Sequence, residues 1–468
     1  MDKATNSSWA PVDVEPDDSA WRRAVGRQIL SEANDLKRTP AALAAELAWS
    51  ADRVTEIIEG RADARLVRQF VSEMANHYPI SLADIWLDPD DTDAGVRIVT
   101  AAQSEASARV FDRPDRTGRR TPYYEYRDTA MSRGAPFRPE WISEIRVVDD
   151  DDPNNADVAY NQGHILHQST FFIGPVNFYW EVDGRRHCSE MNTGDSNYIT
   201  PFIPHSFTSR TAERRGLIIA VTFAGEVARA RKELSAMGHE AAEELAGDLR
   251  DGQRFARRLQ RQLSVESMSE ADLVTLLANR GISRERAMAL LAGSSDPQFE
   301  EVEAAAAALT IRPQDLVATG MDARDAVVVE HRSASARTLV GTDGTPAYLL
   351  RPLARSPLQP LMKGFDVSVL GAGNAPFQHS LHEYVYNYGD TPVLLAWHGE
   401  RETLLAPRDS AYVRPCLRHS FRCAERSAPG QLVVIRIPGA LTDSVVDEYA
   451  AFEPTRRRRV ISEDRTWF

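Results

Sequence analysis

One constellation of side chains occurs twice in this chain, and the repetition limits the folds that the chain can adopt. Each set contains two histidines and one amide or carboxylate side chain at matching spacings: His164, Gln168 and His205 in the first half, and His379, Glu383 and His419 about 215 residues later. Repetition over such a distance indicates duplicated domains rather than a short-period solenoid. The duplication predicts two domains of common descent, but it does not say which copy binds a metal ion.

The segments around the two sets also repeat. Helical patterns cover residues 19–87 and again 255–317, with Thr39 and Ser50 at expected N-cap positions and Gly60 at an expected C-cap position. Each helical region precedes β-branched and alternating runs, "QSTFFIGPVNFYWEVDG" and "GLIIAVTFAG" in the first half and "HEYVYNYGDTPVLLAWHG" and "GQLVVIRIPG" in the second. Such runs, broken by Gly, Pro and Asp, predict antiparallel barrels or sandwiches. The predicted fold class is therefore α+β.

Length and charge exclude several classes of function. A chain of 468 residues predicts two to four domains. The net charge of −13 argues against non-specific nucleic-acid binding, which needs a surplus of Lys and Arg on one face. No apolar stretch approaches the roughly 20 residues of a membrane-spanning helix, and the first residues lack the basic and apolar segments of an export signal. We therefore expect a cytoplasmic protein that binds neither membrane nor nucleic acid.

The first set has the composition of a metal site. We expect alternation along one strand to place His164, Leu166 and Gln168 on one face, with His205 joining from "PFIPHSF" after a Gly-Asp turn. Two imidazoles and one oxygen donor leave positions open on a ferrous ion for O2 and a chelating substrate. The same residues also fit ordinary polar side chains in a barrel mouth. By ligand type alone the second set, with the carboxylate of Glu383, is the better metal site.

The residues around the first set resemble a known family. "NQGH", a ligand four residues further on and "PHSF" after a glycine-containing turn resemble the iron site of the 2-hydroxyethylphosphonate dioxygenase/methylphosphonate synthase family. That resemblance implies a tandem repeat of a helix-turn-helix-like helical module followed by a cupin β-barrel. It also implies Fe(II) bound by His164, Gln168 and His205, because glutamine is a third ligand in parts of this family and "YITPFIPH" has no carboxylate.

The resemblance implies boundaries for each part. We expect an N-terminal helical module at 19–90, a catalytic first cupin at 91–225, a connector helix with a second helical module at 226–322, a structural second cupin at 323–450 and a C-terminal tail at 451–468.

The resemblance further implies residues that bind the substrate. Asn161 matches an asparagine that contacts the phosphonate, and Tyr126, in "RRTPYYEYRD", matches a tyrosine that donates a hydrogen bond to it. The two tyrosines just before Tyr126 fit core positions instead. Arg120, rather than the arginine before it, is the expected phosphonate-binding guanidinium. Lys37 matches a lysine that reaches from a helical module into an active site.

The implied reaction is the oxidative cleavage of 2-hydroxyethylphosphonate to hydroxymethylphosphonate and formate, with Fe(II) and O2 and without 2-oxoglutarate. Such a step belongs to the biosynthesis of phosphonate natural products, antibiotics among them. A homo-oligomer is expected, since Lys37 could serve a neighbouring subunit.

Three alternatives stay open. The nearest is methylphosphonate synthase, which acts on the same substrate. A helix-turn-helix and cupin transcriptional regulator has a similar layout, but its candidate recognition helix, "SADRVTEIIEG", carries three acidic residues and one arginine, which disfavours DNA. An isomerase or lyase with another divalent metal would keep the ligands but would not consume O2.

Overall fold

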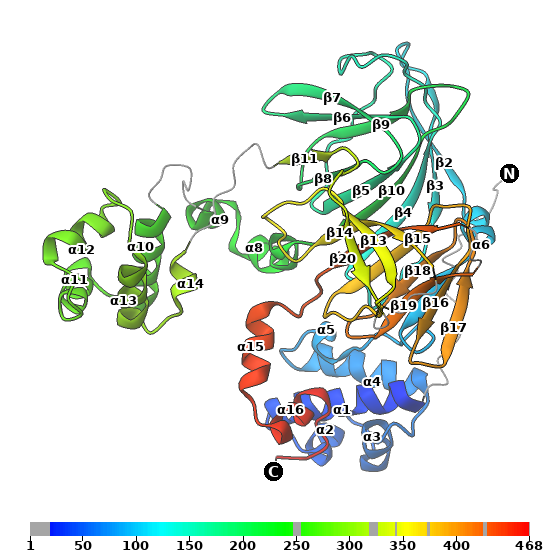
Figure 1. Cartoon of the computed structure of the whole chain (residues 1–468). Helices are drawn as coiled ribbons and strands as arrows, with labels where there is room; N and C mark the ends of the chain where they lie inside the picture. The colour runs from blue at the N-terminus through cyan, green and yellow to red at the C-terminus, as the bar shows by residue number, and fades with distance from the viewer. Residues whose placement is uncertain are drawn as a thin grey trace. The chain divides into compact units, whose positions relative to one another are not determined.

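The computed structural model describes residues 19–246, 254–317, 326–341, 344–371, 375–424 and 428–467 (Figure 1). The described residues divide into two compact units, one from the residues up to 224 together with 327–468, and one from 225–326. No helix within these ranges is long and apolar enough to cross a membrane. The expected boundary between residues 322 and 323 lies outside the described residues.

Five helices open the larger unit: α1 (Ser19–Asp35), α2 (Pro40–Glu46), α3 (Ala51–Ile58), α4 (Ala64–His77) and α5 (Leu82–Ile85). Thr39 and Ser50 cap α2 and α3 through their side-chain oxygens, as the sequence predicts. Gly60 follows α3 with a φ of 71°, and a Cβ there would lie 2.6 Å from the backbone nitrogen of Arg23. The apolar faces of these helices meet in one core that includes Trp21.

The first sheet pair joins strands β2 (Arg109–Pro114), β3 (Arg120–Asp128), β4 (Phe137–Glu144), β5 (His167–Ile173), β6 (Val176–Val182), β7 (Arg185–Met191), β8 (Ser196–Ile199), β9 (His205–Ser209), β10 (Leu217–Phe223) and β11 (Val327–Glu330). A seven-stranded sheet has the order β11-β8-β5-β10-β4-β3-β2, and a three-stranded sheet has the order β7-β6-β9. All of these pairings are antiparallel.

The second sheet pair joins β1 (Val96–Val99), β12 (Arg337–Val340), β13 (Pro346–Pro352), β14 (Lys363–Val369), β15 (His382–Asn387), β16 (Val393–Trp397), β17 (Arg401–Leu405), β18 (Ser410–Val413), β19 (His419–Cys423) and β20 (Gly430–Ile437). Its sheets have the orders β1-β18-β15-β20-β14-β13-β12 and β17-β16-β19, antiparallel throughout. Strand for strand, the two pairs have the same order. The predicted strand runs and the antiparallel α+β class are therefore confirmed.

One edge strand of each large sheet comes from the other half of the chain. Strand β1 pairs with β18, with Val96 opposite Val413, and β11 pairs with β8, with Val327 opposite Ile199. By sequence, β1 falls in the range expected for the first cupin and β11 in the range expected for the second. Each large sheet therefore contains one strand from the half of the chain that forms most of the other sheet.

The two seven-stranded sheets share one hydrophobic core. Phe171 on β5 faces this core, where Phe137 packs edge-on against Tyr384 at 6.3 Å. The next residue, Phe172, faces the interior of the first sheet pair. Strand β5 is therefore buried on both faces, and of its residues only Ile173 is partly exposed.

Helices complete both units. A short helix, α6 (Ala101–Ala106), follows β1, and the larger unit ends with α15 (Asp443–Ala451) and α16 (Pro454–Ile461). Asn34 on α1 binds the segment after α16: its side chain donates to the carbonyl of Arg465 at 2.8 Å and accepts from the N–H of Trp467 at 3.1 Å. The smaller unit contains α7 (Glu226–Arg229), α8 (Arg231–Met237), α9 (His239–Ala246), α10 (Arg254–Glu266), α11 (Glu270–Ala278), α12 (Arg284–Leu291), α13 (Phe299–Leu309) and α14 (Pro313–Leu316). Its core includes Leu259 and Leu277.

Candidate metal centre

The first histidine set lies where the loop before β5 meets the loop before β9. The N–H of His205 donates to Asn161 Oδ1 at 2.9 Å, and the N–H of Asn161 donates to the carbonyl of His205 at 3.0 Å. Gly163 has a φ of 70°, and a Cβ there would lie 2.4 Å from the carbonyl carbon of Phe202. Glycine at this position therefore lets the two loops approach and brings the distant histidines together.

Both imidazoles are oriented by backbone carbonyls. Nδ1 of His164 donates to the carbonyl of Leu166 at 2.8 Å, and Nδ1 of His205 donates to the carbonyl of Ile203 at 2.8 Å. The rings lie 5.5 Å apart at 86° to each other. A proton on Nδ1 leaves a lone pair on Nε2, the arrangement of a ligating histidine. Burial lowers the pKa of His205 to about 4, so this ring is neutral at neutral pH, as a metal ligand must be.

Gln168, the second residue of β5, completes the set. Its Nε2 donates to Thr170 Oγ1 at 2.9 Å, and this bond turns Oε1 toward His164 Nε2 at 3.3 Å. Two lone pairs therefore face each other, which is unfavourable unless a positive charge lies between them. The two imidazole nitrogens and one amide oxygen fit a divalent metal ion such as Fe(II).

The expectation of strand alternation is wrong for the start of this set. Strand β5 begins at His167, so His164 and Leu166 lie in the preceding loop. That loop is held by the N–H of Phe202, which donates to the carbonyl of His164 at 2.8 Å. A turn, rather than the period of a strand, brings His164 over the side chain of Gln168.

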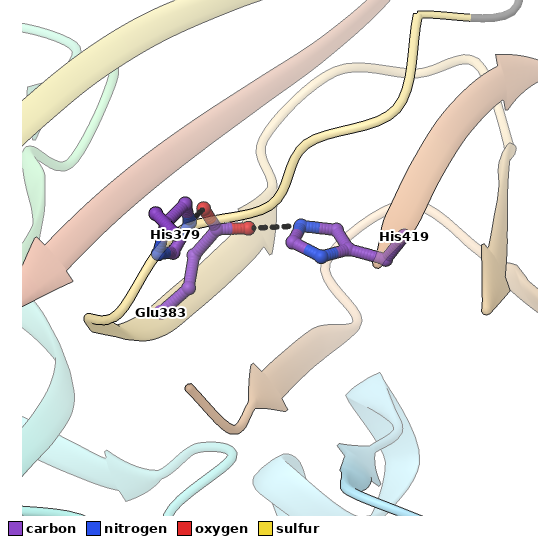
Figure 2. Close-up of side chains that lie close together, drawn as sticks. All are labelled: His379, Glu383 and His419. Carbon is purple, nitrogen blue, oxygen red and sulfur yellow. Dashed lines mark hydrogen bonds and ion pairs between the residues drawn. The ribbon is translucent and has the colours of Figure 1, made fainter. Parts of the chain in front are cut away.

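The second histidine set also converges (Figure 2). Glu383 Oε2 lies 2.9 Å from His379 Nε2, and Glu383 Oε1 lies 2.8 Å from His419 Nε2. The structure adds a cation that the sequence pattern did not reveal, since Arg436 Nε donates to Glu383 Oε2 at 2.7 Å.

Comparisons with known proteins show the family to which the chain belongs. No protein-family model matches it. The methylphosphonate synthase of Nitrosopumilus maritimus (strain SCM1) is 32% identical over 468 residues, which covers 98% of each chain. The solved structure of Streptomyces albus HEPD with 2-hydroxyethylphosphonate and Fe(II) bound is 36% identical, with a TM-score of 0.85 over 96% of this chain and 100% of that one. The chain belongs to the 2-hydroxyethylphosphonate dioxygenase/methylphosphonate synthase family. Another solved 2-hydroxyethylphosphonate dioxygenase, 17% identical over 93% of this chain and 99% of its own, has the same fold with a TM-score of 0.74.

Asn161, the expected phosphonate contact of this family of enzymes, also has a structural role. Its Oδ1 accepts from the N–H groups of Gly163 and His205, each at 2.9 Å. Its Nδ2 lies 3.0 Å from His205 Nε2, where a ligated metal would be. Metal binding would occupy that lone pair and free the amide N–H for an anionic ligand.

Tyr126 and its neighbours have different surroundings. Tyr126 packs against Phe111 at 4.9 Å, and burial raises the pKa of its phenol, which therefore stays protonated and able to donate. Tyr123 and Tyr124 are buried, and their hydroxyls lie 2.8 and 3.2 Å from Ser206 Oγ. The interpretation of these two tyrosines as core aromatics is confirmed, and they hold the strand that begins at His205.

A second arginine, Arg113, is a candidate besides the predicted one. Arg120 is exposed and donates to the carbonyl of Asp112 at 2.6 Å. Half-buried Arg113 acts on the site electrostatically: burial is the main cause of the lowered pKa of His205, and the charge of Arg113 adds to it. A β-bulge between Phe111 and Asp112 shifts the pairing of β2 with β3 just before Arg113, and the pattern of residues does not show that shift.

Lys37 contacts the C-terminal end of the chain instead of the histidines. It has a φ of 60°, its Nζ donates to the carbonyls of Asn34 and Asp35 at 3.4 Å, and it lies 5.0 Å above the ring of Trp467. Its role in an active site stays a prediction.

Proposed function

We propose that the chain is an Fe(II)- and O2-dependent enzyme that cleaves the carbon–carbon bond of 2-hydroxyethylphosphonate to give hydroxymethylphosphonate and formate. His164 Nε2, His205 Nε2 and Gln168 Oε1 would hold the iron. The observation that carries the proposal is the approach of Gln168 Oε1 to His164 Nε2, 3.3 Å apart, while Nδ1 of His164 is bonded to a backbone carbonyl. The 36% identical relative solved with that substrate and Fe(II) supports it.

The bound iron would supply the centre at which O2 is reduced. The reaction balances with one O2 per substrate and needs neither 2-oxoglutarate nor an external reductant. The chain's own residues bind and orient the substrate, and burial keeps His205 neutral.

The charge of the site favours an anion. A glutamine ligand adds no negative charge, so the metal keeps its full charge beside a phosphonate. Two unit charges about 4 Å apart attract by about 4 kcal/mol near a protein surface, so the missing carboxylate strengthens the hold on the substrate. Asn161 Nδ2 and the protonated phenol of Tyr126 are suited to donate to phosphonate oxygens.

Arg113 is proposed as the guanidinium that binds the phosphonate, with Arg120 as the alternative. Arg113 is half-buried and its charge acts on both His205 and Tyr126. A guanidinium can pair with two phosphonate oxygens at once, which fixes the orientation of the substrate.

The finer architecture is also part of the proposal. Two helix-turn-helix-like modules and two cupin barrels would alternate with the boundaries expected from sequence, apart from the exchanged strands β1 and β11. The matching strand orders of the two sheet pairs support common descent of the barrels. Lys37 lies beside Trp467 of its own chain. Its role in the site of a neighbouring subunit, and with it the homo-oligomer, is proposed from the sequence resemblance.

Methylphosphonate synthase activity is the second candidate, favoured by the 32% identity to the Nitrosopumilus maritimus enzyme over nearly the whole chain. Both candidates take the same substrate. They differ in the fate of the one-carbon phosphonate fragment, which no single contact in this site decides.

One experiment separates these candidates. The protein is loaded with Fe(II) without oxygen, 2-hydroxyethylphosphonate and O2 are added, and the products are followed by phosphorus NMR. Hydroxymethylphosphonate with formate establishes the dioxygenase, with Gln168→Ala expected to abolish turnover, and methylphosphonate establishes the synthase. Unchanged substrate with protein that holds iron and consumes no O2 would refute both.

A further inference from the structure

The second histidine set occupies positions equivalent to those of the first. Glu383 is the second residue of β15, as Gln168 is of β5, and these two strands have the same place in their sheets. His419 begins β19, as His205 begins β9. His379, like His164, lies in the loop before its strand. The two sets are therefore equivalent in three dimensions as well as in spacing.

The histidines of the second set are oriented in the same way. Nδ1 of His379 lies 3.1 Å from the carbonyl of Leu381, two residues later, and Nδ1 of His419 lies 2.9 Å from the carbonyl of Leu417, two residues earlier. The first set uses the same two offsets. The carbonyls thus direct Nε2 of both rings toward Glu383, as in the ligand pair of the first set.

The ligand atoms converge on one small volume (Figure 2). The nitrogens of His379 and His419 and the carboxylate of Glu383 all lie within 4.8 Å of one another. Glu383 is fully buried and His419 is 2% exposed. The two rings approach different oxygens of the carboxylate, so one ion could bind all three residues.

Arg436 is the difference between the two sets. It lies opposite Glu383 on β20, where the first sheet pair has Thr222 opposite Gln168 on β10. Its Nε donates to Oε2, the oxygen that His379 Nε2 also approaches, while Oε1 faces His419 Nε2. Arg436 pairs with the buried carboxylate, and the two histidines add two nitrogens that approach it at ligand geometry.

We propose that His379, Glu383 and His419 bind a second divalent metal ion, with Arg436 holding the carboxylate in position. Two imidazoles and a carboxylate suit Fe(II), Co(II) and Zn(II) more than the all-oxygen preference of Mg(II) or Ca(II). The inference stands apart from the proposed reaction, because it assigns this ion no role in turnover.

The test counts metal ions. Metal-free protein is saturated with Co(II), freed of excess by gel filtration and analysed by elemental mass spectrometry together with its visible spectrum. Wild type should hold one equivalent at each set. His379→Ala should lose one equivalent and keep its far-UV circular dichroism, because the ion pair of Glu383 with Arg436 remains. His164→Ala should lose the other, and the double variant should lose both.

A matched control is available in the same strand. His382 is half-buried, bonds Tyr412 Oη through Nδ1 at 2.8 Å and belongs to neither set, so His382→Ala should keep both equivalents. Glu383→Gln serves as a second variant if His379→Ala does not fold. A single equivalent in wild type that only His164→Ala removes would overturn the proposal, as would a second equivalent that survives both His379→Ala and Glu383→Gln. Failure of the proposed reaction would appear separately, as unchanged substrate in phosphorus NMR with both metal equivalents in place.

Discussion

Thr170 determines which end of the Gln168 amide faces the proposed metal. Gln168 Nε2 donates to Thr170 Oγ1 at 2.9 Å, and both side chains are buried, Gln168 at 4% and Thr170 at 0% exposure. Thr170→Val replaces the acceptor with a methyl group of similar size. The amide N–H then either stays unpaired, at a cost of about 1–3 kcal/mol, or turns toward His164 and removes the oxygen ligand. Loss of such a supporting bond lowers metal affinity by roughly 10–100-fold.

Competition with a chromogenic chelator under anaerobic conditions measures the affinity of the first set for Co(II) or Fe(II). All variants carry His379→Ala as well, so that the measured metal binding comes from the first set alone. Thr170→Ser, which keeps the hydroxyl, should bind nearly as wild type. Thr208→Val is the matched control, because Thr208 is equally buried on β9 and its hydroxyl bonds Tyr179, at 3.4 Å, instead of the Gln168 amide. Wild-type affinity in Thr170→Val, or an equal loss in Thr208→Val, would show that the hydrogen bond does not orient the ligand.

Three further changes give separate expectations. Arg113→Ala should raise the KM for 2-hydroxyethylphosphonate by roughly 10–100-fold, because it removes a charge-assisted contact of about 1.5–3 kcal/mol, while Arg120→Ala changes it little; the opposite order in steady-state kinetics would restore the choice made from sequence. Gly163→Ala should destabilise the fold by about 1–3 kcal/mol through its positive φ, in addition to the clash with Phe202, and chemical denaturation measures this. Glu144 is fully buried, and neither of its carboxylate oxygens has a hydrogen-bond partner among the described residues. Burial raises its pKa well above the ordinary value of 4.5, so the folded state holds a proton that the unfolded state releases, and stability contributed by this group is lost as pH rises above 4.5. Glu144→Gln should therefore gain stability relative to wild type by up to about 1.4 kcal/mol per pH unit above that value, and a pH-independent difference in denaturant unfolding would contradict the assignment.

The two histidine sets differ in the residue that lies opposite the third ligand on the neighbouring strand. Gln168 has an uncharged partner across the strand pair in Thr222, whereas Glu383 has Arg436. Gln168 and Thr222 are both uncharged, and the charges of Glu383 and Arg436 balance each other. The choice between an amide and a carboxylate ligand is therefore coupled to a residue on another strand.

Local chemistry in the sequence determined much of this protein. The repeated spacing of His164, Gln168 and His205 indicated a candidate metal site, and the resemblance to a known family implied that these residues are its ligands. The alternating and β-branched runs predicted the strands, because burial pattern is a property of nearby residues. The N-caps Thr39 and Ser50 were predicted for the same reason, since a cap acts within one turn of its helix.

Only the tertiary structure decided the rest. One edge strand of each large sheet comes from the other half of the chain, and no local sequence pattern predicts which strand an edge strand pairs with. A β-bulge shifts the pairing of β2 with β3 just before Arg113. Arg436 contacts Glu383, 53 residues away in the sequence, because their strands pair. The loop geometry at Gly163, rather than strand alternation, brought His164 to Gln168. These contacts join residues far apart in sequence, so their geometry depends on how the whole chain packs, which the composition of each segment does not specify.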